Sequence, residues 1–163
     1  MNNTEVIKTE YDANGNVIYE KDSEGIEYWF EYDDLTGNVV YAKDSTGFEM
    51  RCSSITGKTI YAKKSNGIEC WYGDNGKINH IKNPDGIEYW VDYDENGNTI
   101  HRKYPDGYEI WYEYDENDKL LSSHDTRGFI YRYNDRRIII YAEDSNGNKV
   151  WFDDDGNRIQ EKY

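Results

Sequence analysis

The amino-acid sequence predicts an all-β protein, an antiparallel β-hairpin repeat meander of about 14 short strands, curled into a spiral or barrel-like sheet. Three observations support this fold class. Glycines, or residues in their place, recur at steps of 9 to 12 residues. The runs between them are five to seven residues long, alternate polar with apolar residues, and are rich in Ile, Val, Tyr, Trp and Phe. No segment has the 3.6-residue period of an amphipathic helix.

The glycine-containing turns alternate between two kinds along the chain. One kind reads "DANG", "DENG" or "DDDG", and the other reads "DSEG", "NPDG" or "DSNG". A full repeat is therefore about 20 residues, and seven copies cover roughly residues 11–163. Asp118 and Arg137 stand at the two places where the rhythm lacks a glycine. We expect residues 1–163 to form a single domain.

The turn sequences predict the register of the hairpins. In "KDSEGIEYWF" a three-residue Ser-Glu-Gly loop sets Tyr19 opposite Trp29. In "YDENGNTI" a two-residue Asn-Gly turn, with positive φ at both positions, sets Tyr93 opposite Ile100. The two registers agree on which side chains share a face of the sheet.

One face of the predicted sheet, the apolar face, collects most of the large aliphatic and many aromatic side chains and is expected to be the core. After the Asn-Gly turns its third place holds Ile18, Val40, Ile60, Asn79, Ile100, Leu121, Ile140 and Ile159. After the other turns it holds sets such as Ile26-Tyr28-Phe30, Ile87-Tyr89-Val91 and Tyr108-Ile110-Tyr112. This face must be covered, by curling or closing of the sheet or by pairing with a second copy in a homodimer.

The opposite face, the aromatic–acidic face, places Trp between carboxylates and is the candidate partner-binding surface. Its candidate binding residues are Trp29, Trp71, Trp90, Trp111, Trp151, Glu27, Glu31, Glu88, Asp92, Glu109 and Glu113. Neighbouring strands add a ladder of Tyr19, Tyr41, Tyr61, His80, His101 and Tyr141, flanked by lysines. Two interpretations remain open: the ladder stabilises a sheet that has few aliphatic residues, or it anchors a partner.

Charge and hydropathy restrict the class of partner. The chain has 163 residues and a formal charge of -14, which disfavours direct binding to nucleic acid or to an anionic membrane and favours a basic protein partner, or serves solubility alone. No apolar run of 18 residues and no secretory signal is recognised, so a cytoplasmic location is expected. Cys52 and Cys70 are expected to be reduced, on the apolar face, too far apart for a disulfide.

The sequence contains no pattern that requires a cofactor, a metal or a catalytic group. "DYDENG" matches half of a calcium loop, but Lys103 occupies the place of the bidentate Glu. His80 and His101 lie in the same column about 10 Å apart and cannot share one ion. Carboxylates recur in every repeat rather than as one unique pair. We therefore expect no cofactor, no bound metal and no enzymatic activity.

Several phrases resemble the YD repeat of the RHS family, namely "YDANGNVIYEKDSEGIEYWFEYD", "WVDYDENGNTIHRKYPDG" and "YEYDENDKLLSSHDTRGFIYRY". The resemblance extends over nearly the whole chain, although "WYGDNG" lacks the Tyr-Asp pair. It implies a spiralling antiparallel sheet, which in the family forms shells around toxin domains or surface proteins.

Two functions follow as hypotheses. The first is a non-enzymatic, acidic inhibitor or immunity-type module that engages a basic protein, such as a nuclease, through the aromatic–acidic face and turns. The alternative is an RHS/YD-type surface or carbohydrate-binding structural module.

Overall fold

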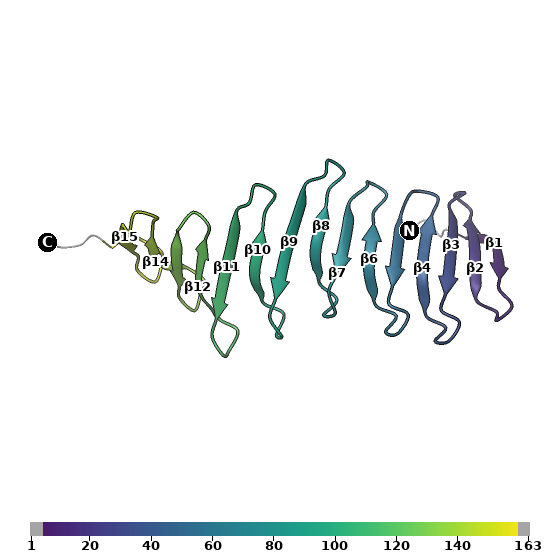
Figure 1. Cartoon of the computed structure of the whole chain (residues 1–163), viewed down its shortest axis with the longest axis horizontal. Helices are drawn as coiled ribbons and strands as arrows, with labels where there is room; N and C mark the ends of the chain where they lie inside the picture. Colours follow the sequence, from purple (N-terminus) through teal and green to yellow (C-terminus); the bar gives the residue numbers. More distant parts are fainter. Residues whose placement is uncertain (1–4, 160–163) are drawn as a thin grey trace. The chain divides into compact units, whose positions relative to one another are not determined.

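The structure, a computed structural model, describes residues 5–159, which contain fifteen β-strands and no helix (Figure 1). The strands are β1 (Val6–Tyr11), β2 (Val17–Asp22), β3 (Glu27–Tyr32), β4 (Val39–Asp44), β5 (Glu49–Cys52), β6 (Thr59–Lys63), β7 (Glu69–Tyr72), β8 (Ile78–Lys82), β9 (Glu88–Tyr93), β10 (Thr99–Lys103), β11 (Glu109–Tyr114), β12 (Leu120–Asp125), β13 (Ile130–Tyr133), β14 (Ile139–Glu143) and β15 (Lys149–Trp151). Among these residues no helix exists that could cross a bilayer.

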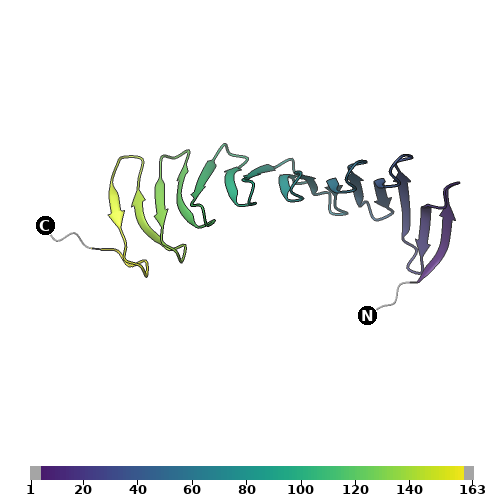
Figure 2. The same cartoon turned by 90° about the horizontal axis from the view of Figure 1, so that it is seen from below.

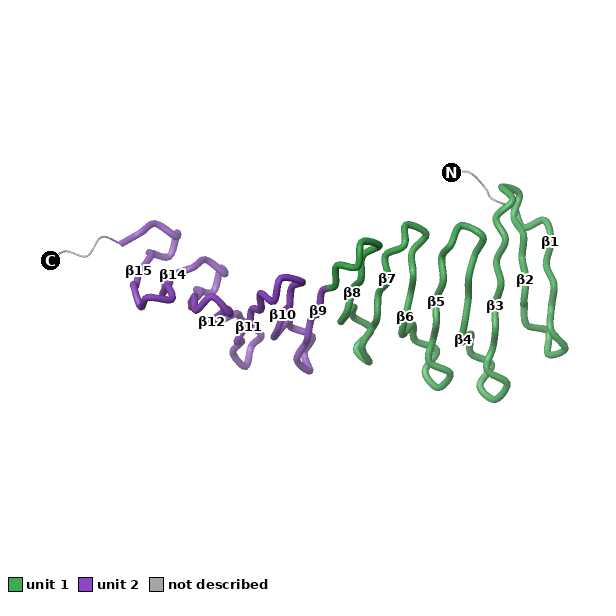
Figure 3. The backbone as a smooth tube through the Cα atoms, turned by 45° about the horizontal axis from the view of Figure 1, so that its top comes forward, with its two compact units in different colours: residues 1–88 green, residues 89–163 purple. Residues whose placement is uncertain are grey.

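The chain divides into two compact units, residues 1–88 and residues 89–163 (Figure 3). Within each unit the strands lie side by side in sequence order and run antiparallel in a single layer (Figure 2). The strand order is linear, which confirms the predicted antiparallel meander as an open sheet rather than a closed barrel. The expectation of a single domain over residues 1–163 stays a prediction.

Turns of the two predicted kinds share one hydrogen-bond pattern, except for the turns 33–38 and 53–58, which are one residue longer. In the turn 22–26 the Asp22 N–H donates to the Ile26 carbonyl over 3.0 Å, and the Gly25 N–H donates to the Asp22 carbonyl over 3.1 Å. The turn 94–98 closes in the same way, with both bonds at 3.0 Å. The predicted two-residue Asn-Gly turn with two positive φ angles is therefore wrong. In residues 5–159 positive φ outside glycine occurs only at Asp118 and Arg137.

A β-bulge accompanies seven of the eight turns that were predicted to be of the Asn-Gly kind. At the eighth, Phe152 and Arg158 form an isolated bridge. Tyr93 lies opposite Thr99 rather than opposite Ile100 as predicted, and Asp92 lies opposite His101. Ile100 is the extra residue on the bulged strand. The three-residue loop shifts the register by one residue and the bulge shifts it back. The prediction of which side chains share a face is therefore correct, although the predicted turn is not.

The bulges explain why the predicted core column is not buried. The extra residues of the seven bulges are Ile18, Val40, Ile60, Asn79, Ile100, Leu121 and Ile140. Four of them are exposed, from 36% for Ile18 to 48% for Leu121, and Ile159 beyond them is 51% exposed. A bulge leaves its extra residue outside the regular cross-strand pairing, so fewer neighbours cover it. The assignment of this column to a buried core is wrong.

Burial on the apolar face instead falls on small side chains between larger ones. Ala42 is 5% exposed and lies opposite Phe30 on one side and Met50 on the other. Ala62 is 7% exposed and lies between Met50 and Cys70. Within a single layer, large side chains lean over small neighbours on adjacent strands and shield them from water. The core of this sheet is therefore thin and lies within one layer.

The two cysteines lie where the sequence places them. Cys52 and Cys70 are both free thiols, and both are buried, with exposures of 9% and 1%. Cys70 pairs with Ala62 across β6 and β7, on the apolar face. These observations confirm the predicted absence of a disulfide between them.

Asp118 and Arg137 replace glycine in two turns and adopt its conformation. Both have φ of 61°, in the left-handed region, where the side chain costs about 1–2 kcal/mol. The Arg137 N–H donates to the Asn134 carbonyl over 2.8 Å, as a glycine does in the other turns. The Asp118 carboxylate also accepts amide hydrogens from Asn96 and Asn98, over 2.8 and 2.7 Å.

Arg137→Gly is expected to raise the free energy of unfolding by about 0.5–1 kcal/mol, because it removes the left-handed penalty and only part of this is offset by glycine's greater freedom in the unfolded chain. Chemical denaturation measures the change. Asp118→Gly is the matched control and should gain less, because it also removes two hydrogen bonds. A larger gain at Asp118 would contradict this account.

Aspartates at the first position of the turns clamp the loops. The side-chain amide of Asn16 and then its N–H hold the pKa of Asp12 below the ordinary value of 3.8. Asn148 lowers the pKa of Asp144 in the same order. A carboxyl with a lower pKa in the folded state binds its proton more readily when the chain is unfolded. Such a carboxyl stabilises the fold at pH values above its pKa in the unfolded chain. Its contribution is lost as the pH falls through its pKa in the folded chain.

Acid is therefore expected to lower the midpoint of chemical unfolding once the pH falls below about 4, with little change from these groups between about pH 5 and 7. Asp144→Asn should flatten the acid limb, because the charge that titrates is gone. Asp34→Asn is the control, since the Asp34 side chain clamps no turn. An unchanged acid limb in Asp144→Asn would rule out this explanation.

Candidate binding surface

The strand pairing brings the side chains of the aromatic–acidic face together as predicted. Trp71 pairs with Tyr61 on β6 and His80 on β8. Trp111 pairs with His101 on β10 and His124 on β12. Arg51 and Arg132 take the place of Trp, and their guanidinium carbons lie over the rings of Tyr61 and Tyr141, at 5.8 and 5.0 Å. Within each unit, aromatic and cationic groups of this face contact one another across neighbouring strands.

Trp111 is stacked between two imidazoles of this ladder. Its ring stacks on His101 at 5.0 Å, with 13° between the planes. It stacks on His124 at 5.2 Å, with 12° between the planes. The indole stands between two imidazoles, and both of its flat surfaces are covered. His124 was not predicted to belong to this ladder, because the sequence places it two positions beyond the histidine column.

Each of the other tryptophans has at least one aromatic or cationic neighbour. His80 stacks on Trp71 at 4.3 Å and 18°. Tyr19 packs against Trp29 at 5.8 Å, and the Lys43 ammonium lies 5.3 Å from the Trp29 ring. The remaining two have partners as well: the Lys103 ammonium lies 5.9 Å from the Trp90 ring, and Tyr141 packs against Trp151, which is 41% exposed.

The candidate carboxylates separate into paired and unpaired groups. Glu27 accepts from the Lys21 ammonium over 3.0 Å. Glu88 contacts the His80 ring over 3.0 Å, and Glu109 contacts the His101 ring over 2.8 Å. Glu31 and Glu113 form the unpaired group, and both are exposed. Glu31 forms no ion pair in residues 5–159, and Glu113 accepts a hydrogen bond from the Ser122 hydroxyl rather than from a cation. Among the predicted binding residues, Glu31 and Glu113 are therefore the exposed carboxylates that form no ion pair in residues 5–159 and are available to an outside cation.

His101 joins two candidate carboxylates into one cluster. Its Nδ1 lies 2.9 Å from Asp92, and its Nε2 lies 2.8 Å from Glu109. Sequence reasoning treated this histidine only as a replacement for Tyr. A histidine with a carboxylate on each neighbouring strand was the signal that could have revealed the bridge. The cluster orders β9, β10 and β11 locally and occupies both ring nitrogens.

Tyrosine hydroxyls on both faces donate to carboxylates. Burial, followed by the hydrogen bond from its hydroxyl to Glu69, raises the pKa of Tyr61 to about 12. Burial and the hydrogen bond to Asp125 raise the pKa of Tyr108 to about 12 as well. Both phenols therefore stay neutral donors at physiological pH, and they hold the carboxylates in place.

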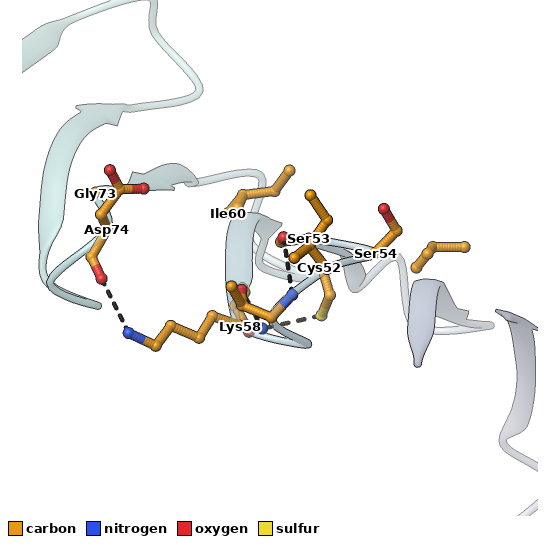
Figure 4. A pocket seen from close by; sticks show the side chains of 11 residues that line it. Cys52, Ser53, Ser54, Lys58, Ile60, Gly73 and Asp74 are labelled. Atoms are coloured by element: carbon orange, nitrogen blue, oxygen red, sulfur yellow. Dashed lines mark hydrogen bonds between the residues drawn. The ribbon is translucent and has the colours of Figure 1, made fainter. Parts of the chain in front are cut away.

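A cavity of about 670 Å³ lies away from these candidate residues, at one edge of the N-terminal unit (Figure 4). It is lined by Val40, Cys52, Ser53, Ser54, Ile55, Thr56, Lys58, Thr59, Ile60, Gly73 and Asp74. The Lys58 ammonium donates to the Asp74 carbonyl over 3.0 Å, which links two of the lining residues. None of the predicted binding residues lines this cavity.

Fold and surface together define a β-hairpin repeat module. Residues 93–130 match the family model described as RHS Repeat, which confirms the predicted resemblance over that stretch. In the structure this stretch runs from the end of β9 to the first residue of β13. No curated protein matches the chain.

Solved structures of Tc toxin proteins are similar to the chain. One is the Photorhabdus luminescens Tc holotoxin pore, at 16% identity and a TM-score of 0.38, with 88% of this chain and 9% of that chain covered. Another is TcdB2-TccC3 without its hypervariable C-terminal region, at 14% identity and a TM-score of 0.39, with 93% of this chain and 10% of that chain covered. The present chain spans about a tenth of the length of those chains.

Trp111→Ala is expected to lower the free energy of unfolding by about 2 kcal/mol, because it removes an indole that two imidazoles enclose. Trp151→Ala is the matched control and should cost about 1 kcal/mol or less, since Trp151 has one aromatic partner and is more exposed. Chemical denaturation of both variants measures the difference. Equal losses would show that the stacked ladder adds no stability.

Proposed function

We propose that the chain is a non-enzymatic repeat module that binds a basic partner protein through its aromatic–acidic face, in the manner of an acidic inhibitor or immunity-type protein. The observation that carries the proposal is the division of the carboxylates. Glu31 and Glu113 occupy the same position beside Trp29 and Trp111 in two repeats, and neither has a cation of its own. With a formal charge of -14, the chain attracts a basic surface over a long range.

The geometry explains how such a face would act. Its aromatic rings are packed against each other across neighbouring strands, so the backbone that carries Glu31 and Glu113 is ordered before a partner arrives. A prearranged surface loses less conformational entropy on binding. Electrostatic steering would make association fast and strongly dependent on salt.

A carbohydrate-binding role is less compatible with this arrangement. Sugar rings stack on the open surface of an aromatic ring, whereas both ring surfaces of Trp111 are covered by imidazoles, and one ring surface of Trp71 is covered by His80. The second candidate function is that of a structural RHS-type segment. It is favoured by the match of residues 93–130 to that family model. The two roles are separable, since a structural segment needs no basic partner.

The immobilised chain is expected to retain a basic protein from host extract at about 50 mM salt and to release it at about 300 mM salt. When that protein is purified and titrated by calorimetry, Glu31→Lys combined with Glu113→Lys should weaken binding about tenfold or more, because both changes place a cation against a cationic surface. Glu24→Lys, an equal change of charge in an exposed turn, is the control for each substitution and should have a small effect.

Two results would count against the proposal. One is recovery of no basic protein at low salt. The other is a loss of affinity in Glu24→Lys as large as in the double variant, which would show that net charge, rather than the aromatic–acidic face, determines binding.

A further inference from the structure

Two neighbouring turns of the N-terminal unit are longer than the turns beside them. The turns 33–38 and 53–58 close between their first and sixth residues, whereas the turns 12–16 and 73–77 close between their first and fifth. Each of the four turns joins a strand to a bulged strand, and all four lie at the same end of the strands. One extra residue therefore lengthens the turn in each of two consecutive repeats.

The longer turns expose the two most accessible aliphatic side chains among the large hydrophobic residues of the described chain. Leu35 is 95% exposed and Ile55 is 84% exposed. Both stand two residues before the turn glycine. The residues at that place in the other turns of this kind are small or charged, namely Ala13, Asp74, Glu95, Glu116, Asp135 and Asp154. Aliphatic tips are thus confined to these two turns, and the sheet gains no burial from them.

The two tips are held in place by hydrogen bonds between the turns. The Thr36 hydroxyl and the Asn38 side-chain amide both donate to the Ser54 carbonyl over 2.8 Å. Within the first turn the Asp33 carboxylate accepts from the N–H groups of Leu35 and Thr36, over 3.1 and 2.9 Å. The exposed side chains are therefore carried by an ordered platform, which lowers the entropy lost when a partner binds.

An apolar groove continues from the second tip. Ile55 lines the cavity of about 670 Å³, together with Val40 and Ile60, which is 47% exposed (Figure 4). The Cys52 side chain also lines this cavity, and its sulfur lies 3.9 Å from the Thr59 hydroxyl. A side chain of moderate size that contacts Ile55 would have an apolar wall beside it.

The charges around these turns indicate what kind of chain fits them. Asp34 precedes Leu35, and Asp74 lies beyond Lys58. Both aspartates are exposed, and neither forms an ion pair in residues 5–159. The Lys58 ammonium is engaged by the Asp74 carbonyl. A second copy of this chain would bring carboxylates against carboxylates, which repel, so the complementary occupant is cationic.

We propose that the turns 33–38 and 53–58 are the docking site for a segment of the basic partner in which aliphatic or aromatic side chains are flanked by Lys or Arg. The inference rests on the proposed function. It assigns the apolar anchoring of the partner to Leu35 and Ile55, because the tryptophans are already packed within the ladder. Asp34 and Asp74 receive the flanking cations.

The test uses the full chain, with labelled methyl groups, and a synthetic peptide in which two lysines stand on either side of Leu-Trp-Leu. Methyl resonances of Leu35, Ile55 and Ile60 are expected to shift and saturate in NMR titration. Leu35→Ser combined with Ile55→Ser should weaken binding at least tenfold, since two aliphatic contacts are lost. Ile7→Ser, at another exposed isoleucine of this unit, is the control and should leave the affinity unchanged.

The double serine variant should keep the parent's melting temperature, because Leu35 is 95% exposed and Ile55 is 84% exposed. The inference is overturned if the double variant binds the peptide as tightly as the parent, if a peptide with glutamates in place of the lysines binds equally well, or if these turns mediate dimerisation of the chain. Retained sensitivity of the natural partner to Glu31→Lys with Glu113→Lys, without sensitivity at Leu35 and Ile55, would overturn this site and leave the proposed function intact. Recovery of no basic partner would remove the proposed function itself.

Discussion

The structure depends on a constraint that couples each turn to a bulge. A loop of three or four residues that ends on a residue in the left-handed region reverses the chain, and at alternate turns a bulge three residues later restores the register. If either part were missing, every residue beyond it would move to the opposite face. Because the two parts recur together in seven hairpins, the aromatic–acidic face stays aligned through the repeats of each unit. The aspartate that opens most turns adds hydrogen bonds to the loop N–H groups and fixes where the reversal begins.

The single-layer sheet has a particular consequence for its aromatic residues. With no second layer within a unit to pack against, side chains gain burial mainly from neighbours on adjacent strands. Large rings stacked along the sheet serve this purpose better than branched aliphatic residues, because flat surfaces cover one another without a layer above them. His101, Trp111 and His124 show the arrangement most completely. The stacking of Trp111 and Trp71 on neighbouring imidazoles supports a stabilising role of the ladder. The assignment of these tryptophans to a partner-binding surface stays a prediction.

The periodic features of this fold were predictable from the sequence, and the irregular ones were not. Strands, faces and the pairing of Tyr19 with Trp29 follow from glycine spacing and alternation alone. The bulge at Ile100 could not be inferred from the sequence, because a two-residue turn without a bulge leads to the same pairs beyond it. The exposure of Ile60 was missed for the same reason, since alternation assigns a residue to a face but does not measure how many neighbours cover it. Carboxylates on the strands beside His101 indicated that a bridge was possible, but its two contacts depend on side-chain positions, which the sequence alone does not give.

Repeats of this kind separate what stabilises the sheet from what distinguishes one surface from another. The ladder contacts join adjacent strands, so a residue inserted at a turn tip leaves them in place. The turns 33–38 and 53–58 show this directly: each is longer by one residue, yet the strands that follow them keep the bulged register of the other repeats. A chain built in this way acquires a new contact surface at its turns without repacking its faces. Specific recognition is therefore expected to reside in departures from the repeat, and the aliphatic tips at Leu35 and Ile55 are the clearest such departures in the described chain.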